Sequence, residues 1–264
     1  MLHYKVSGEG KPLVLVHGLF GSLENVGAIA RLLSSDFKVY SVDLPNHGRS
    51  PHKAGMDLAH MAECVSNWMG SVGLSKAFLV GHSLGGKVAM EIALSQPERA
   101  EKVAVIDIAP VTYAARHHDV FAGINAVDPA AISSRGDAEA IASAYIKEPA
   151  VLSFILKNLV RTETGFEWRM NLQDLQEQYP TLIHENRSGA VFAKPVLFLK
   201  GGDSDYIRPE YRNNILQRFP QAQLKVIPNT GHWLHAEKPD LTATLIRKFL
   251  LAATGVGSDA SNPE

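Results

Sequence analysis

The sequence predicts an α/β protein built on a mostly parallel sheet, and two observations carry this prediction. Short apolar runs alternate with stretches at helical spacing along residues 1–110, and the alternation resumes along 194–251. Strands separated by helices in this way form a parallel sheet with crossover helices. Residues 111–193 instead hold few strand-like runs and several helical patterns. Because a structureless connection of that length is uncommon, we expect a mainly helical cap inserted into the core.

Each element is predicted from its residue pattern, in chain order. Apolar runs rich in β-branched residues predict strands at 13–17, 38–42, 77–80, 103–106, 195–199 and 224–227. Apolar residues three and four apart predict core helices at 24–33, 56–72, 87–95, 209–219 and 234–251, and cap helices at 116–127, 137–146, 151–160 and 172–178. A hairpin is expected around Thr164-Gly165. Residues 252–264, rich in Gly, Ser, Asp and Asn, predict a flexible tail.

The composition narrows the expected partners and compartment. The 264 residues carry 26 Lys and Arg against 27 Asp and Glu, so charge gives no reason to expect nucleic acid or an anionic membrane as a partner. The N-terminus lacks a signal-peptide pattern, and no apolar run reaches the roughly 20 residues of a membrane span. A single cysteine, Cys64, fits a reducing compartment. We therefore expect a cytoplasmic monomer or homodimer that acts on a small molecule.

The most informative motif is Gly81-His82-Ser83-Leu84-Gly85-Gly86, which follows the apolar run 77–80 and precedes a helix. A strand, Gly-X-Ser-X-Gly and a helix form a nucleophile elbow, whose tight turn presents the serine oxygen at the sheet edge. The alternative is a phosphate-binding turn. That turn needs Gly-Lys followed by Ser or Thr, or Gly-X-Gly-X-X-Gly, and this segment has neither. We predict that Ser83 is a nucleophile.

A serine hydroxyl needs a general base within hydrogen-bonding reach. The candidate is His232, in the segment NTGHW (229–233) between the last predicted strand and the last helix. This position agrees with the chain order serine, acid, histidine of such folds. His235, three residues on, raises the alternative of a metal site. No His-Glu-X-X-His spacing accompanies it, so we predict no metal and no cofactor.

Two aspartates compete as the acid that orients His232. Asp107 ends the strand after the elbow helix, and Asp205 lies in the loop after the next-to-last strand. Both positions lie at the carboxyl ends of neighbouring strands, so either reaches the same histidine in principle. A turn-capping role is the alternative for each. Spacing alone leaves the choice open.

Two backbone N–H groups are predicted to form an oxyanion hole. One belongs to Leu84, after the nucleophile. The other belongs to Leu19 in the loop HGLFG (17–21), where glycines allow close approach to a carbonyl. Such a donor typically contributes about 3 kcal/mol of transition-state stabilisation. His17 itself is expected to brace this loop by hydrogen bonding.

Four segments in chain order resemble those of the α/β-hydrolases, namely HGLFGS (17–22), DLPNHGRS (43–50), GHSLGG (81–86) and GHW (231–233). The resemblance extends from about residue 2 to residue 250. Within that superfamily the chain resembles the YbfF-type bacterial esterases and related human α/β-hydrolase domain proteins, on segments 106–111, 168–171, 201–204 and 231–239. The resemblance implies an α/β-hydrolase fold with a small helical cap, and hydrolysis of short- to medium-chain acyl esters or acyl-CoA thioesters.

The resemblance also implies roles for single residues. In that subgroup the aspartate of the Ile-Asp-Ile-Ala-Pro segment, here Asp107, and the serine of Gly-Gly-X-Ser, here Ser204, are both tied to the catalytic histidine. This chain departs from the pattern with Asp205, which stands where the wider superfamily places its acid. We favour Asp107 and keep Asp205 as its rival.

Substrate-binding residues are expected in the cap and around the nucleophile. Arg116, His117 and His118 form a basic cluster that would meet an anionic substrate group or else lie in solvent. Large aromatic residues are expected to line an acyl pocket or to belong to the core, and they are Phe20, Phe121, Phe154, Trp168, Tyr206 and Trp233.

The leading functional prediction is hydrolysis of esters or thioesters through an acyl-enzyme on Ser83. Carbon–carbon bond hydrolysis of a diketone and cofactor-free haloperoxidase chemistry use the same triad and stay as alternatives. Dehalogenases and most epoxide hydrolases of this fold are disfavoured, because they place aspartate at the nucleophile position. A ligand-binding receptor with vestigial catalysis is the alternative outside enzymes, since a fold alone does not define a function.

Overall fold

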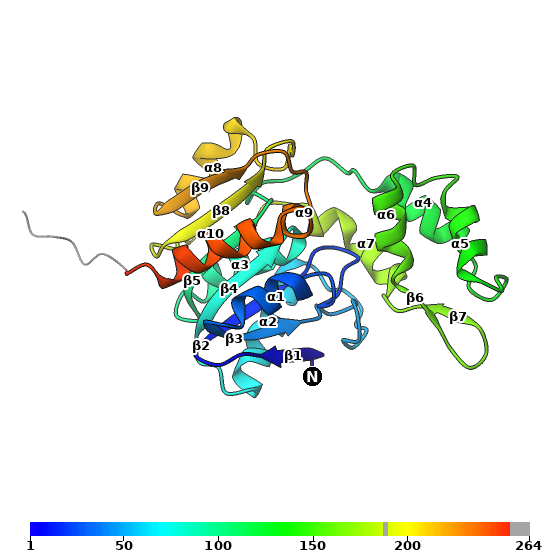
Figure 1. Cartoon of the computed structure of the whole chain (residues 1–264), viewed down its shortest axis with the longest axis horizontal. Coiled ribbons are helices and arrows are strands. Elements are labelled where there is room, and N and C mark those ends of the chain that lie inside the picture. Colours follow the sequence, from blue (N-terminus) through cyan, green and yellow to red (C-terminus); the bar gives the residue numbers. More distant parts are fainter. Residues whose placement is uncertain (187–189, 254–264) are drawn as a thin grey trace, which may run out of the picture.

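The computed structural model describes residues 1–186 and 190–253 (Figure 1). Its described residues contain a seven-stranded sheet in the order β1-β3-β2-β4-β5-β8-β9. The strands are β1 (Tyr4–Ser7), β2 (Lys11–Val16), β3 (Phe37–Val42), β4 (Ala77–His82), β5 (Ala100–Ile106), β8 (Val196–Gly201) and β9 (Ala222–Ile227). β1 pairs antiparallel with β3, and all other neighbours are parallel. The predicted α/β class with a mostly parallel sheet is confirmed.

Burial explains which strands could be predicted from the sequence. Every residue of β4 is buried, and β2, β5 and β8 are buried over most of their length, so each reads as a continuous apolar run. Strand β1 was not predicted. It has four residues, none of them fully buried, and it lies at the sheet edge, so it carries no clear pattern.

Helices cover both faces of the sheet. One face packs α1 (Gly27–Leu33), α9 (Leu234–Glu237) and α10 (Pro239–Leu251) around a shared apolar cluster. The other face packs α2 (Leu58–Ser71), α3 (Leu84–Ser95) and α8 (Arg212–Arg218). The single helix predicted over 234–251 is two helices, because a proline disfavours helical backbone angles at the residue before it, and Lys238 has the non-helical angles φ −134° and ψ 65°.

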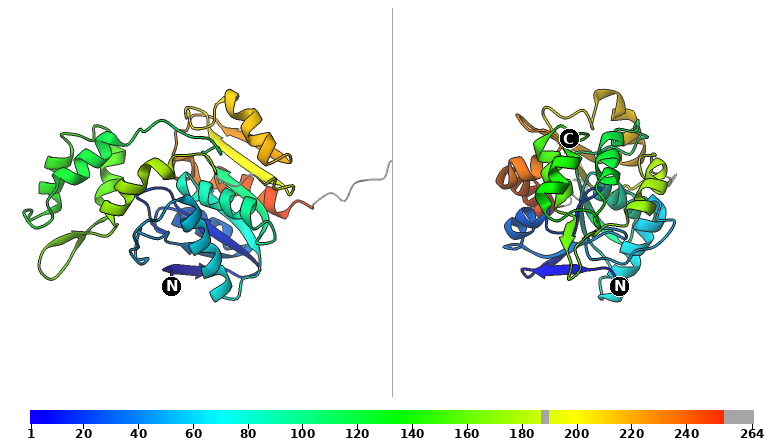
Figure 2. Two further views of the ribbon diagram at one scale, coloured as in Figure 1. Left: turned by 180° about the vertical axis from the view of Figure 1, so that it is seen from behind. Right: turned by 90° about the vertical axis from the view of Figure 1, so that its right-hand side faces the viewer.

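The segment between β5 and β8 is mainly helical, as Figures 1 and 2 show. It contains α4 (His118–Ala126), α5 (Arg135–Ala142), α6 (Pro149–Leu156), α7 (Leu172–Leu182) and the antiparallel pair β6 (Leu159–Arg161) and β7 (Phe166–Trp168). The hairpin around Thr164-Gly165 is present. The helix predicted over 151–160 ends at Leu156, because its last residues belong to that hairpin. Of the predicted tail 252–264, residues 254–264 lie outside the described residues.

Two buried polar side chains, Asp174 and Lys87, hold this helical segment against the core. Asp174 of α7 accepts hydrogen bonds from Asn46 Nδ2 and from the Gly55 N–H, each at 2.6 Å. The Lys87 ammonium of α3 donates to Val111 C=O at 2.9 Å and to His184 C=O, one carbonyl from each linker of the segment. The helix that follows the nucleophile is therefore joined directly to both ends of the insertion.

Candidate active site

Ser83 stands on a strained turn between β4 and α3. Its backbone has φ 52° and ψ −118°, a conformation that L-residues adopt only when the surroundings enforce it. A Cβ at Gly81 would lie 2.1 Å from Gly85 O, and one at Gly85 would lie 2.4 Å from His17 O. Only glycine fits both flanking positions, so the sequence motif and the observed turn have the same physical cause.

Asp107 is the carboxylate that contacts His232. The side chain of Asp107 is fully buried, and its Oδ2 lies 2.8 Å from His232 Nδ1. Oδ1 accepts the Gly201 N–H at 2.9 Å, and Oδ2 also accepts the Ser204 hydroxyl. Three donors from two different loops therefore surround one carboxylate, which agrees with the roles that the family resemblance implied for Asp107 and Ser204.

Strand register brings Ser83 and Asp107 to the same edge of the sheet. His82 and Ile106 are register partners at the ends of β4 and β5, and Ser83 N–H donates to Ile106 C=O at 3.0 Å. The next residue, Asp107, has φ 53°. The His232 loop closes over the end of β8 because Gly201 has no side chain: a Cβ there would lie 2.2 Å from Gly231 O.

Asp205, the rival acid, lies in solvent and pairs with arginines. Its side chain is 58% exposed, and it contacts Arg116 at 2.6 Å and Arg208 at 3.0 Å. The hydrogen bond from Arg116 lowers the pKa of this carboxyl below its ordinary value. Among the described residues, Asp205 makes no hydrogen bond with His232, so the geometry favours Asp107 as the acid.

The His232 ring packs against two other rings. The ring centroids of Tyr206 and His82 lie 3.9 Å and 4.7 Å from that of His232. Within the described part of the chain, Ser83 and His232 are not hydrogen-bonded to each other. Such contacts often tighten only when substrate binds.

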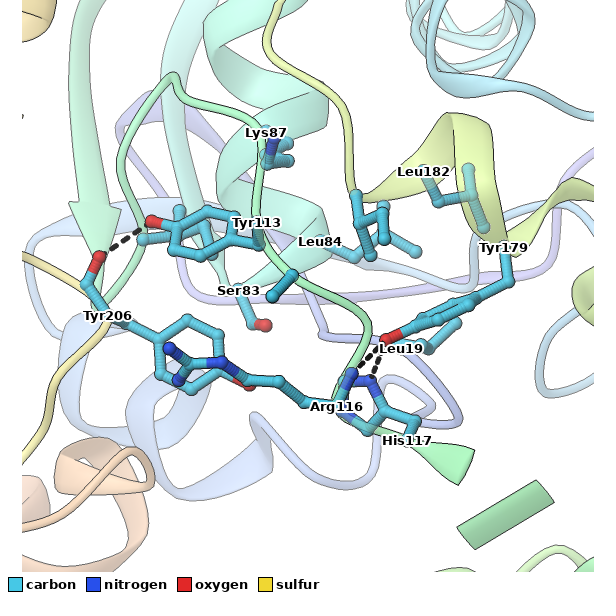
Figure 3. Close-up of a pocket in the computed structure, with 13 residues that line it drawn as sticks. Leu19, Ser83, Leu84, Lys87, Tyr113, Arg116, His117, Tyr179, Leu182 and Tyr206 are labelled. Atoms are coloured by element: carbon cyan, nitrogen blue, oxygen red, sulfur yellow. Dashed lines mark hydrogen bonds between the residues drawn. The ribbon is translucent and has the colours of Figure 1, made fainter. Parts of the chain in front are cut away.

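The two predicted oxyanion donors flank the same space as Ser83. Leu19, Ser83 and Leu84 line one pocket (Figure 3), and neither the Leu19 nor the Leu84 N–H has a protein acceptor among residues 1–186 and 190–253. The Leu19 loop is braced by His17, whose Nε2 accepts the Leu44 N–H at 3.0 Å and whose Nδ1 donates to Gly18 C=O at 2.8 Å. Burial lowers the pKa of His17 to about 4, so it braces the loop as a neutral ring.

The pocket walls come from α3, from α7 and the linkers of the insertion, and from the loops after β2 and β8. Figure 3 shows Arg116 and Tyr206 on one side of Ser83, with Tyr179 and His117 on the other. The apolar part of the lining is Leu19, Leu84, Ile108, Ala114, Leu182 and Ile183. Of the lining residues, Lys87, Tyr113 and Tyr179 were not named as substrate-binding candidates from the sequence, whereas His117 was named as part of the basic cluster.

Of the predicted substrate-binding residues, Arg116 and Tyr206 line this pocket. Phe20, His118, Trp168 and Trp233 are not among the described residues that line it. Phe20 packs on Phe121 with the ring centroids 5.2 Å apart, and Trp233 packs on Phe154 at 5.6 Å. In the basic cluster, Arg116 and His117 line the pocket, whereas His118, the first residue of α4, does not. The sequence showed this basic cluster, but it did not show that α4 begins at His118.

No metal centre is seen in the part of the chain that the structure describes, since no group of three or more His, Cys, Asp or Glu side chains there is placed to hold an ion. His82 and His235 lie near His232 as rings packed together, with the His82 and His235 centroids 4.1 Å apart. Burial lowers the pKa of His235 to about 3, which fits a packed neutral ring. None of the helices in the described residues is long and apolar enough to cross a membrane.

The fold and these site residues define a class of protein, and comparison with known proteins identifies the same class. A family model described as "Alpha/beta hydrolase family" matches residues 13–245. The chain therefore belongs to the alpha/beta hydrolase family, and the predicted family membership is confirmed.

Individual relatives make the resemblance more specific. The chain is 42% identical to Esterase YbfF of Escherichia coli over 92% of its length and 94% of that protein. It is 35% identical to the sn-1-specific diacylglycerol lipase ABHD11 of Mus musculus, over 90% of this chain and 80% of the relative. A solved structure called Marine microorganism esterase superposes with a TM-score of 0.91 at 35% identity, covering 94% of this chain and 98% of the other. These relatives are named esterases and lipases, in agreement with the prediction of an ester-hydrolysing enzyme.

Proposed function

We propose that this protein is a serine hydrolase of carboxylic esters, with an acyl-enzyme on Ser83 as its intermediate. The observation that carries the proposal is the 2.8 Å contact between the buried Asp107 carboxylate and His232 Nδ1, beside a serine on a strained elbow. A histidine held at Nδ1 by a carboxylate presents Nε2 as the base, which is the arrangement that serine hydrolysis requires.

In the proposed acylation step, Ser83 Oγ attacks the ester carbonyl and transfers its proton to His232 Nε2. The carbonyl oxygen becomes negatively charged and is stabilised by the Leu19 and Leu84 N–H groups. The tetrahedral intermediate collapses, and His232 returns the proton to the departing alcohol. Water then attacks the acyl-enzyme with the same base, releasing the carboxylic acid and free Ser83.

The pocket lining supports short to medium acyl chains as the substrates, thioesters such as acyl-CoA included. Its apolar side chains suit an acyl group, and Arg116 supplies a cation at the opposite side of Ser83. We propose Phe20, Trp168 and Trp233 as substrate contacts only for a substrate longer than this pocket. His118 would contribute charge at the start of α4. The cytoplasmic location and the monomeric or homodimeric state stay predictions.

A fluorophosphonate probe tests the proposal, because it reacts with an activated serine whatever the natural acyl chain is. We expect one adduct per chain on the Ser83 peptide by mass spectrometry, and none in Ser83→Ala. The same samples should turn over p-nitrophenyl butyrate and butyryl-CoA, which compares an oxygen ester with a thioester. A folded wild-type protein without an adduct would contradict the serine-hydrolase proposal. An adduct without ester or thioester turnover would favour the carbon–carbon hydrolase or haloperoxidase alternatives.

A further inference from the structure

The Tyr206 ring lies flat against the imidazole of His232. Their centroids are 3.9 Å apart and their planes differ by 20°. The His82 ring also contacts this imidazole, but its centroid lies 4.7 Å away and its plane is tilted by 44°. The nearly parallel contact belongs to Tyr206, and this residue therefore has the largest influence on the plane of the imidazole.

The plane of the imidazole matters because the hydrogen bond to Asp107 does not define it. A single contact at Nδ1 leaves the ring free to swing about the line from Nδ1 to the carboxylate oxygen, and that swing moves Nε2. In the described structure Nε2 is not hydrogen-bonded to Ser83, so this contact does not hold the ring plane either. A displacement of about 1 Å in a reacting group costs as much as 100-fold in rate.

Tyr206 is itself held by the residues that surround Asp107. The Tyr206 N–H donates to Ser204 Oγ at 3.2 Å, and the Ser204 hydroxyl donates to Asp107 Oδ2. The Tyr206 C=O accepts the Tyr113 hydroxyl at 2.6 Å, and the same hydroxyl accepts the Ala109 N–H at 2.8 Å. The backbone of Tyr206 is thus tied to the carboxylate that holds His232 at Nδ1.

The phenol oxygen of Tyr206 takes no part in these contacts. Among residues 1–186 and 190–253 it has no hydrogen-bond partner, whereas the ring is covered on one side by His232. Arg116 contacts the same ring, with Cζ 5.1 Å from its centroid. The contacts therefore depend on an aromatic ring at this position, and phenylalanine retains all of them.

We propose that Tyr206 is a positioning residue for His232. Its ring sets the imidazole plane so that Nε2 faces Ser83, and its π-face stabilises the imidazolium formed when His232 takes the Ser83 proton. The inference rests on the proposed serine-hydrolase function. It differs from the simpler role of a pocket wall, because a wall changes substrate binding while a positioning residue changes the chemical step.

Two substitutions separate these roles. Tyr206→Phe keeps the ring, and we expect kcat within about twofold of wild type, since only an unpartnered hydroxyl is removed. Tyr206→Leu removes the ring, and we expect kcat to fall about 10- to 100-fold with KM within about twofold. The loss should be equal for p-nitrophenyl acetate and p-nitrophenyl octanoate, and fluorophosphonate labelling of Ser83 should slow by the same factor. Tyr211→Leu is the matched control. It makes the same substitution at a neighbouring tyrosine, whose ring contacts the Tyr113 ring at 6.0 Å, and kcat should stay at the wild-type value.

Several results would overturn this inference. Unchanged kcat in Tyr206→Leu removes the positioning role, and a chain-length-dependent change in KM alone assigns Tyr206 to the pocket wall. Equal losses in Tyr206→Phe and Tyr206→Leu would show that the hydroxyl, not the ring, matters. If Tyr206→Leu does not fold, Tyr206→His tests the ring in its place, with kcat expected to stay above one tenth of wild type. A wild-type protein that neither labels nor turns over esters would instead defeat the proposed function, which keeps the two failures distinct.

Discussion

The end of β5 and the loop after β8 each offer an aspartate near the same histidine, and their surroundings differ completely. Asp107 is fully buried and is surrounded by the donors Gly201, Ser204 and His232. Asp205 is 58% exposed, and its partners are two arginines. The loop after β8 therefore supplies a hydroxyl to Asp107 and an aromatic ring to His232, while its carboxylate faces outward. Position along a strand does not define a catalytic acid, because the orientation of the side chain decides its role.

The largest expected effect tests this contrast directly. Asp107→Asn should lower kcat about 1,000- to 10,000-fold on p-nitrophenyl butyrate, because an amide in place of the carboxylate stabilises the wrong tautomer of the histidine. Asp205→Asn should leave kcat within about threefold, since exposed ion pairs contribute little. Steady-state kinetics of both variants, with circular dichroism to verify folding, decide the matter. The reverse ranking would assign the acid to Asp205.

The second prediction concerns the loss of folding stability in acid, which we attribute to buried histidines. Burial lowers the pKa to about 4 for His17 and His117 and to about 3 for His47 and His235. The unfolded chain takes up these protons as the pH falls below about 6.5, whereas the folded protein takes them up only near pH 4 or below. The free energy of unfolding should therefore fall by about 1.4 kcal/mol per pH unit for each histidine across this window.

Urea unfolding at pH 7.0, 6.0 and 5.0 measures this loss. Asp205→Asn should retain the wild-type pH dependence, because the arginine contacts hold the pKa of Asp205 below its ordinary value and outside the window. His60→Gln is the control, as the His60 side chain is 57% exposed. A free energy of unfolding that stays constant from pH 7 to pH 5 would mean that these histidines are not buried as neutral rings.

The smallest expected effect concerns the exposed pair of Arg116 and Asp205. Arg116→Gln should change the free energy of unfolding by less than about 1 kcal/mol, the range of surface ion pairs. The same variant should raise KM for butyryl-CoA about threefold and leave KM for p-nitrophenyl butyrate unchanged, since only the thioester carries phosphates. If Arg116→Gln leaves KM unchanged for both substrates, the role of Arg116 is restricted to its contacts with Asp205 and Tyr206.

Much of the site was predictable because its motifs are short and contiguous. The glycines around Ser83 are required because a Cβ at either position would lie 2.1 Å or 2.4 Å from a backbone oxygen. The tight turn is therefore visible in the sequence as glycines next to the serine. His232 was recognised by its place between the last strand and the last helices. In contrast, Tyr179 was not predicted as a pocket residue, since its 2.7 Å contact with His117 joins residues 62 positions apart.

The amino-acid sequence alone predicted the parallel sheet and the inserted helices, and it proposed Ser83 as nucleophile and His232 as base, because apolar periodicity and tight-turn glycines act over a few residues. Its strand pattern did not distinguish Asp107 from Asp205, and only the family resemblance favoured Asp107. That choice depends on contacts across the fold: His232 lies 125 positions from Asp107, and Arg116 lies 89 positions from Asp205. Only the packed structure brings His232 to the buried Asp107 and Arg116 to the exposed Asp205, and burial with its hydrogen-bond donors separates the two carboxylates.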